Sequence, residues 1–288
     1  MSGDYQLVPL ANGSQTLFSA RYGEKMHPGL GPQAEADLLY VRQLRICERL
    51  AATDDEFVIW DVGLGGAANA IATLQATKEI PGNLRLISFD NTPEPLEFAL
   101  KNAAELKFPA GFEREMAALL QDGHTTFQNG KLTVHWEFHL GDFPKWLEAK
   151  AESGKRKAET PSPHAIFYDA FSPAKNPAMW TLPVFTDLFR SLDPQRPCAL
   201  TTYSRSTLLR TTLLLAGFYV GVGHATGMKE ETTIAANTLD LIGEPLGGRW
   251  LERALRSDSA EPLHEPVYSR ARLSPATAEQ LGRHPQFV

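Results

Sequence analysis

Four acidic residues in this chain follow apolar runs of the kind that form buried β-strands. They are Asp61, Asp90, Asp142 and Asp169, after the runs at 57–60, 84–89, 132–140 and 165–168. The carboxyl ends of parallel strands meet at one edge of a sheet, and ligands bind in the crevice outside that edge. The spacing therefore predicts a cleft lined by acidic side chains at the edge of an α/β sheet.

A glycine-bearing turn follows the first of these acids. Gly63 and Gly65 precede small residues at 66–68 and a helix-compatible run at 69–77. Glycine lets the backbone approach a ligand closely, and the free N–H groups of a helix start point toward the same place. The pattern predicts a nucleotide-type cofactor, with Asp90 placed to hold ribose hydroxyls. A turn without a ligand, and a helix-capping role for Asp90, are the alternatives.

The loop after Asp169 carries the densest set of reactive side chains. Residues 170–180 hold a hydroxyl, a lysine and an amide on or next to a loop bracketed by two prolines, beside Phe171 and Trp180. Proline stiffens such a loop, which can then position a substrate against a cofactor. We expect Asp169 to hold the substrate, whereas Trp180 could equally be a core residue. Asp142 could contact an adenine ring or cap the next helix.

Bulk composition limits the classes of protein and site. The chain has 288 residues, 43% of them hydrophobic, and a net charge of −6, which argues against a protein that grips nucleic acid over its whole surface. Its two cysteines have no ligand-spaced partner, and His135 and His139 have no apparent third ligand, so no metal site is predicted. No membrane span or signal peptide is recognisable, so we expect a cytoplasmic protein. The basic run at 150–157 is interpreted as a solvated loop.

The order of the expected elements indicates an α/β fold. A hairpin at 7–22 and a helix at 33–52 precede five strands, at 57–60, 84–89, 132–140, 165–168 and 198–203. Helices are expected between these strands, and a last strand pair at 218–223 and 232–236 follows them. We expect an N-terminal extension at 1–52, a sheet-bearing domain at 53–243 and an extended C-terminal tail at 244–288.

This order resembles the class I S-adenosylmethionine-dependent methyltransferases, whose last strand is antiparallel. Within that class, residues 167–180 (FYDAFSPAKNPAMW) are similar to the D-G/A-F-A/S-P-x-K-N-P-x-M-W segment of the MnmC methyltransferase family. The segments at 22–24, 61–65, 88–90, 141–142 and 215–218, with His27 and Glu35, also match. The chain departs from the family at Ala67, usually glycine, at Ala70, usually bulky, and at 227–231, where the family is often basic.

The resemblance implies a Rossmann-like, mostly parallel seven-stranded sheet and S-adenosyl-L-methionine as cofactor. It implies N-methylation of the 5-aminomethyl group of a wobble (2-thio)uridine in tRNA. No counterpart of the family's FAD-dependent oxidase domain is recognisable, so no flavin is expected. The implied cofactor-binding residues are Asp61, Gly63, Gly65, Asn69, Asp90 and Asp142. The implied catalytic residues are Asp169 and Tyr22, and the implied substrate-binding residues are His27, Glu35, Phe171, Lys175 and Trp180.

Three alternatives to that function are open at this point. The negative net charge favours the same chemistry on another small amine or nucleotide. The bare G-x-G-x-x-A pattern at 63–68 also fits an NAD-dependent oxidoreductase. A protein that binds the cofactor without catalysis would keep the same fold. The sequence predicts no oligomeric state.

Overall fold

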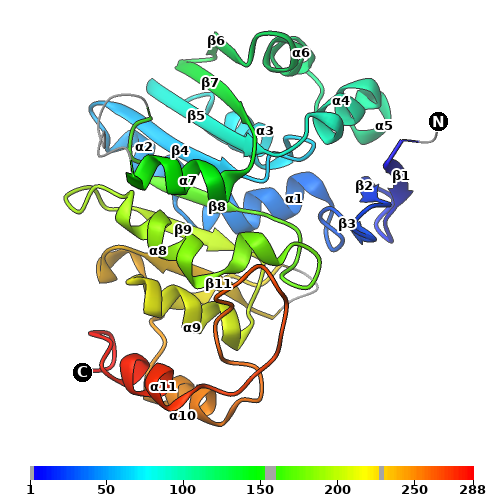
Figure 1. The fold of residues 1–288 in the computed structure, drawn as a ribbon. Coiled ribbons are helices and arrows are strands. Elements are labelled where there is room, and N and C mark those ends of the chain that lie inside the picture. Colours follow the sequence, from blue (N-terminus) through cyan, green and yellow to red (C-terminus); the bar gives the residue numbers. More distant parts are fainter. Residues whose placement is uncertain (1–2, 153–159, 227–229) are drawn as a thin grey trace.

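The centre of the molecule is an eight-stranded, mostly parallel sheet (Figure 1). The computed structural model describes residues 3–152, 160–226 and 230–288; the basic positions at 155–157 and the connection at 227–229 lie outside these ranges. The strand order is β10-β11-β9-β8-β4-β5-β7-β6. The strands are β4 (Glu56–Val62), β5 (Gly82–Asp90), β6 (His124–Asn129), β7 (Leu132–Leu140), β8 (Ala165–Tyr168), β9 (Ala199–Thr202), β10 (Tyr219–Gly223) and β11 (Thr232–Ala236).

All seven expected strands are present, and the prediction of an antiparallel last strand is confirmed, because β11 pairs antiparallel with both β9 and β10. The predicted number of seven strands is wrong by one. The additional strand, β6, pairs antiparallel with β7 at the edge of the sheet. Its sequence HTTFQN is polar and none of its residues is fully buried, so it lacks the apolar pattern by which the other strands were recognised.

Each face of the sheet is covered by its own set of helices. Successive side chains of a strand point to opposite faces, and Phe57 and Ile59 of β4 belong to one buried cluster whereas Val58 and Trp60 belong to the other. The first face packs against the N-terminal helices and against α3 (Ala68–Thr77), α4 (Glu94–Lys101), α5 (Ala103–Leu106) and α6 (Glu113–Asp122). The second packs against α7 (Phe143–Glu152), α8 (Leu182–Arg190) and α9 (Thr207–Ala216).

The N-terminal region forms a small sheet of its own, drawn in dark blue in Figure 1. The predicted hairpin is confirmed as β1 (Tyr5–Pro9) and β2 (Gln15–Ser19), and a short β3 (Glu24–Lys25) extends it. The single helix expected at 33–52 is wrong. It is divided into α1 (Pro32–Ala36), a π-helical segment η1 (Asp37–Arg42) and α2 (Ile46–Ala51). Arg45, with a left-handed φ of 51°, separates α2 from η1.

The C-terminal segment wraps the second face of the sheet, and it is more ordered than the sequence suggested. It contains two helices, α10 (Gly248–Arg256) and α11 (Pro275–Gly282), of which only the first had a detectable apolar pattern. Trp250, Leu263 and Leu281 are buried in the cluster on that face. Leu263 also pairs with Thr181, the residue that caps α8, so the tail supports the chain next to the loop at 170–180. Among the helices in the described ranges, none could span a membrane.

Candidate active site

A cavity of about 480 Å³ lies at the carboxyl ends of β4, β5, β7 and β8, within the size range of small-ligand sites. The small N-terminal sheet and the loop after β8 contribute the rest of its wall. Of the residues predicted from the sequence, those that line it are Tyr22, His27, Glu35, Gly63, Gly65, Asp90, Asp142, Asp169 and Phe171. Asp61, Asn69, Lys175 and Trp180 are not among the lining residues.

The glycine turn and Asp90 form one wall of the cavity. Gly63 and Gly65 have positive φ values of 95° and 52°, and Ala67, where the family usually has glycine, has a φ of 68°. The backbone N–H of Gly65 donates to Asp90 Oδ2 at 2.9 Å, so the end of β5 holds the turn after β4. Burial raises the pKa of Asp90 to about 6, although three backbone hydrogen bonds oppose that shift. The carboxylate remains within reach of a ligand in the cavity.

Asp142 caps the next helix and also lines the cavity, while its contact with an adenine ring stays a prediction. Its Oδ1 accepts a hydrogen bond from the backbone N–H of Lys145 at 3.0 Å, in the first turn of α7. The same residue lines the cavity, beside Gly141 and Phe143. The cap fixes the carboxylate at the edge of the cavity.

Asp61 and Asn69 lie behind the cavity wall. Asp61 is completely buried, accepts a hydrogen bond from the Ser88 hydroxyl at 3.0 Å, and has its pKa raised by burial to about 8. The indole of Trp136 in turn donates to Ser88 at 3.0 Å. Asn69 donates from Nδ2 to Asp169 Oδ2 at 2.8 Å. Both side chains therefore support the site from within the protein, and their cofactor contacts stay a prediction.

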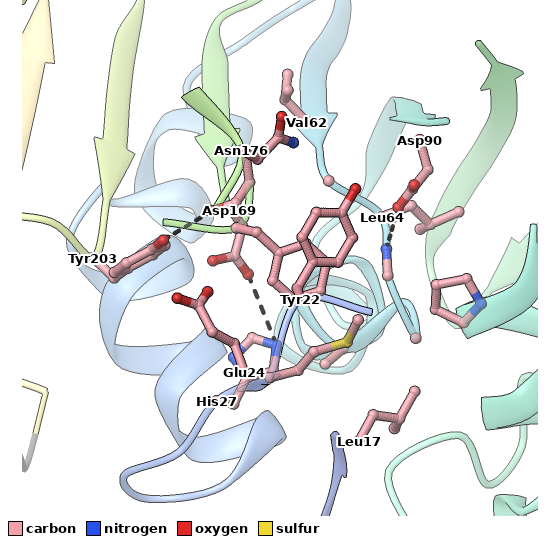
Figure 2. A pocket seen from close by; sticks show the side chains of 18 of the residues that line it. Leu17, Tyr22, Glu24, His27, Val62, Leu64, Asp90, Asp169, Asn176 and Tyr203 are labelled. Carbon is pink, nitrogen blue, oxygen red and sulfur yellow. Dashed lines mark hydrogen bonds and ion pairs between the residues drawn. The ribbon is translucent and has the colours of Figure 1, made fainter. Parts of the chain in front are cut away.

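Asp169 lies at the centre of the cavity, where two segments distant in sequence meet it (Figure 2). Its backbone N–H donates to the carbonyl of Val62 at 2.9 Å, which fixes its position beside the glycine turn. His27 Nε2 lies 3.8 Å from Asp169 Oδ2, and His27 Nδ1 lies 3.9 Å from a carboxylate oxygen of Glu35. The imidazole is thus placed between two carboxylates, with Asp169 nearer the glycine turn.

Aromatic side chains shape the opposite wall. Tyr22 stacks on Phe171 with 4.1 Å between ring centroids and an angle of 18° between the rings. The indole N–H of Trp180 donates to the carbonyl of Phe171 at 2.7 Å. Trp180 itself is completely buried, which agrees with the core alternative for this residue. It acts on the cavity by holding Phe171.

Two residues that make contacts at the edge of the site, Glu24 and Tyr203, were given no role in the sequence analysis. Glu24 of β3 accepts hydrogen bonds from the backbone N–H and the hydroxyl of Ser172. Tyr203, directly after β9, donates from its hydroxyl to the carbonyl of Ala170 at 2.9 Å. Glu24 belongs to the matched segment at 22–24, and Tyr203 ends a parallel strand, so both positions carried a signal. Their partners are not visible in the sequence.

Comparison with known proteins relates this arrangement to methyltransferases. Residues 122–238 match a family model described as S-adenosyl-L-methionine-dependent methyltransferase. The crystal structure of MnmC2 from Aquifex aeolicus resembles this one with a TM-score of 0.68 and 26% identity, covering 98% of this chain and 85% of that one. This chain is an S-adenosyl-L-methionine-dependent methyltransferase that resembles the MnmC proteins. The nicotinamide alternative gains no support from these matches.

Two curated relatives of this methyltransferase are larger proteins. Both are tRNA 5-methylaminomethyl-2-thiouridine biosynthesis bifunctional proteins MnmC. The one from Cupriavidus metallidurans is 26% identical over 79% of this chain and 33% of its own length. The one from Aeromonas hydrophila is 29% identical over 76% of this chain and 34% of its own. The chain therefore spans about a third of the length of these relatives.

Proposed function

We propose that this methyltransferase N-methylates the 5-aminomethyl group of a wobble (2-thio)uridine in tRNA, and that residues 53–243 form its catalytic domain. The observation that carries the proposal is the Asp169 carboxylate, fixed in the cavity by Asn69 and beside the imidazole of His27. A carboxylate in this position suits an acceptor that arrives as an ammonium ion. The names of the relatives support the tRNA nucleoside, because its methylaminomethyl group contains an N-methyl.

The residues around the glycine turn fit the cofactor. The site offers close backbone approach at Gly63 and Gly65 and a carboxylate, Asp90, at the end of the neighbouring strand. This is the combination that holds a nucleoside in open α/β sheets. S-adenosyl-L-methionine supplies an electrophilic methyl group when bound. Asp142 lies farther along the same edge, where it can contact the adenine end.

Replacing Asp90 by asparagine is expected to weaken S-adenosylhomocysteine binding about 10- to 100-fold, since hydrogen bonds to a charged group contribute about 1.5–3 kcal/mol. Wild-type affinity should also fall as the pH drops through about 6, where the Asp90 carboxyl takes up a proton. The asparagine variant should lack that dependence. Calorimetric titration between pH 5 and 8 measures both effects. Equal affinities for the two proteins across this range would remove Asp90 from the cofactor site.

The acceptor amine must lose a proton before it can react. A free alkyl amine titrates at about 10 and is mostly protonated at neutral pH. Asp169 can hold the ammonium in place, but a free aspartate, at about 4, is a weak base, whereas a free histidine titrates at about 6.5. His27 lies directly behind Asp169 and faces Glu35 on its other side. Glu24 is on the same side of the cavity (Figure 2), with its carboxylate held by Ser172. We assign His27 as the group that receives the proton through Asp169.

Replacing His27 by asparagine is expected to lower kcat/KM at pH 7 about 100-fold, the lower end of the usual range of about 10²–10⁴ for proton-transfer catalysis. Asparagine is the suitable replacement because His27 has a φ of 52°, which asparagine tolerates. The deficit should shrink as the pH rises toward ~10, where the amine is neutral in solution. An alkoxyamine analogue of the acceptor, already neutral at pH 7, should be methylated nearly as fast by the variant. A deficit that is the same at every pH and for both acceptors would indicate a purely structural histidine.

A small amine or nucleotide is the second candidate acceptor, favoured by the net charge of −6. Methyl transfer to three acceptors separates the two proposals: tRNA bearing 5-aminomethyluridine, the same tRNA without the modification, and the free nucleoside. We expect transfer only to the two acceptors with the amine, and faster transfer to the tRNA. No transfer to either of them would contradict the proposed function. Faster transfer to the free nucleoside would favour the small acceptor.

A further inference from the structure

Three cationic side chains gather at the rim of the cavity, although the protein as a whole is acidic. They are Arg21, Lys25 and Lys175, and all three are exposed. Among the described residues, none of the three has a carboxylate within ion-pair distance, whereas Arg42 and Arg205, for example, do. Cations left unpaired beside a site are available to an anionic ligand. Only Lys175 had a substrate role predicted from the sequence.

The three cations come from two segments that the fold brings together. Lys25, in β3, lines the cavity. The guanidinium of Arg21 lies 5.6 Å from the centroid of the Tyr22 ring, an arrangement that holds a cation over an aromatic face. Lys175 belongs to the loop after β8, but a Cβ placed on Gly23 would lie only 3.8 Å from its Nζ.

Specific contacts fix these two segments against each other. Glu24 accepts two hydrogen bonds from Ser172, and Tyr22 stacks on Phe171. The carboxylate of Glu24, which adjoins Lys25 in sequence, is therefore engaged with a hydroxyl and a backbone N–H. The contacts that close the cavity therefore also bring the three cations at its rim together. Its positive charge is held in a fixed relation to Asp169 inside.

We propose that Arg21, Lys25 and Lys175 bind backbone phosphates of the RNA strand that presents the acceptor uridine to the cavity. The proposal rests on the proposed function and extends it from the amine to the nucleotides on either side of it. Single-stranded RNA in loops is bound by cations that follow its phosphates, while a base is turned out into a pocket. A protein with a net charge of −6 needs such a local group of cations to hold a polyanion at its site.

The test compares one amine in two settings. The triple variant Arg21→Gln, Lys25→Gln, Lys175→Gln and the wild type are assayed with tRNA bearing 5-aminomethyluridine and with the free 5-aminomethyluridine nucleoside. The ratio of kcat/KM for the tRNA to kcat/KM for the nucleoside is expected to fall about tenfold or more. A plot of log kcat/KM for the tRNA against log salt should become less steep by about 2, since each single-strand phosphate contact contributes about 0.7.

A second triple variant controls for total charge. Lys78→Gln, Lys101→Gln, Arg114→Gln removes the same three charges at positions that do not line the cavity, so its ratio and salt slope should match the wild type. An equal change in both triple variants would overturn the proposal, as would an unchanged ratio in the rim variant. A wild type that methylates the nucleoside but not the tRNA would also overturn it. A wild type that methylates neither acceptor contradicts the proposed function itself.

Discussion

Replacing Asp169 by asparagine is expected to lower kcat/KM for the amine acceptor about 1,000-fold. The substitution keeps the size of the side chain and an oxygen that can accept the hydrogen bond from Asn69. It removes the negative charge that holds the ammonium and the path from the amine to His27. Loss of such a positioned charge and proton path is expected to cost a factor of 10²–10⁴. Methyl incorporation at saturating S-adenosyl-L-methionine measures the effect.

Two further measurements make the Asp169 result specific. The affinity of the variant for S-adenosylhomocysteine should remain within a few-fold of wild type, because Gly63, Gly65 and Asp90 are unchanged. Asp187→Asn, on α8 and outside the cavity, is the matched control and should retain full activity. A fall of less than tenfold in Asp169→Asn, with the cofactor bound normally, would place the reacting amine elsewhere in the cavity.

Much of the site was predicted from acidic residues that follow strand-like runs in the sequence. Asp90, Asp142 and Asp169 were found because each lies at or just beyond the carboxyl end of a strand, where the fold forms its cleft, and all three line the cavity. Asp61 fits the same pattern but is completely buried, with its carboxylate bonded to Ser88. The position of an acid at the carboxyl end of a strand gives the edge of the sheet at which its side chain lies. It does not say whether the side chain reaches the cavity.

Contacts between distant segments were beyond the reach of the sequence. Glu24 and Ser172 are 148 residues apart, and no local pattern pairs them. The edge strand β6 was missed because a polar strand pairs through its backbone and leaves little apolar signature. The interruption at Arg45 was missed because a left-handed residue inside an apolar helical pattern leaves the pattern intact. In each case the structure depends on tertiary contacts that the local sequence pattern does not encode.

Replacing Gly63 by alanine is expected to damage the fold and the site together. Gly63 has a φ of 95°, and a Cβ there would lie 2.7 Å from the carbonyl oxygen of Asp169 and 2.9 Å from its carbonyl carbon. These are backbone atoms at the end of a parallel strand, so the overlap is relieved only by moving the ends of β4 and β8 apart. Left-handed alanine costs about 1–2 kcal/mol, and overpacking about 1–3 kcal/mol more.

That cost predicts a melting temperature about 5–15 °C below wild type, because 1 kcal/mol corresponds to roughly 2–4 °C in a protein approaching this size. Methyl transfer should fall at temperatures where the variant is still folded, since Asp169 would be displaced from Asn69 and His27. Gly247→Ala is the control: a Cβ there meets nothing within 4 Å and its φ is −107°. A Gly63→Ala variant with wild-type stability and activity would show that the close approach of these strand ends is dispensable. Loss of both stability and activity would indicate that the glycine turn holds two parts of the site in place: the wall that binds the cofactor and the Asp169 carboxylate that faces the acceptor.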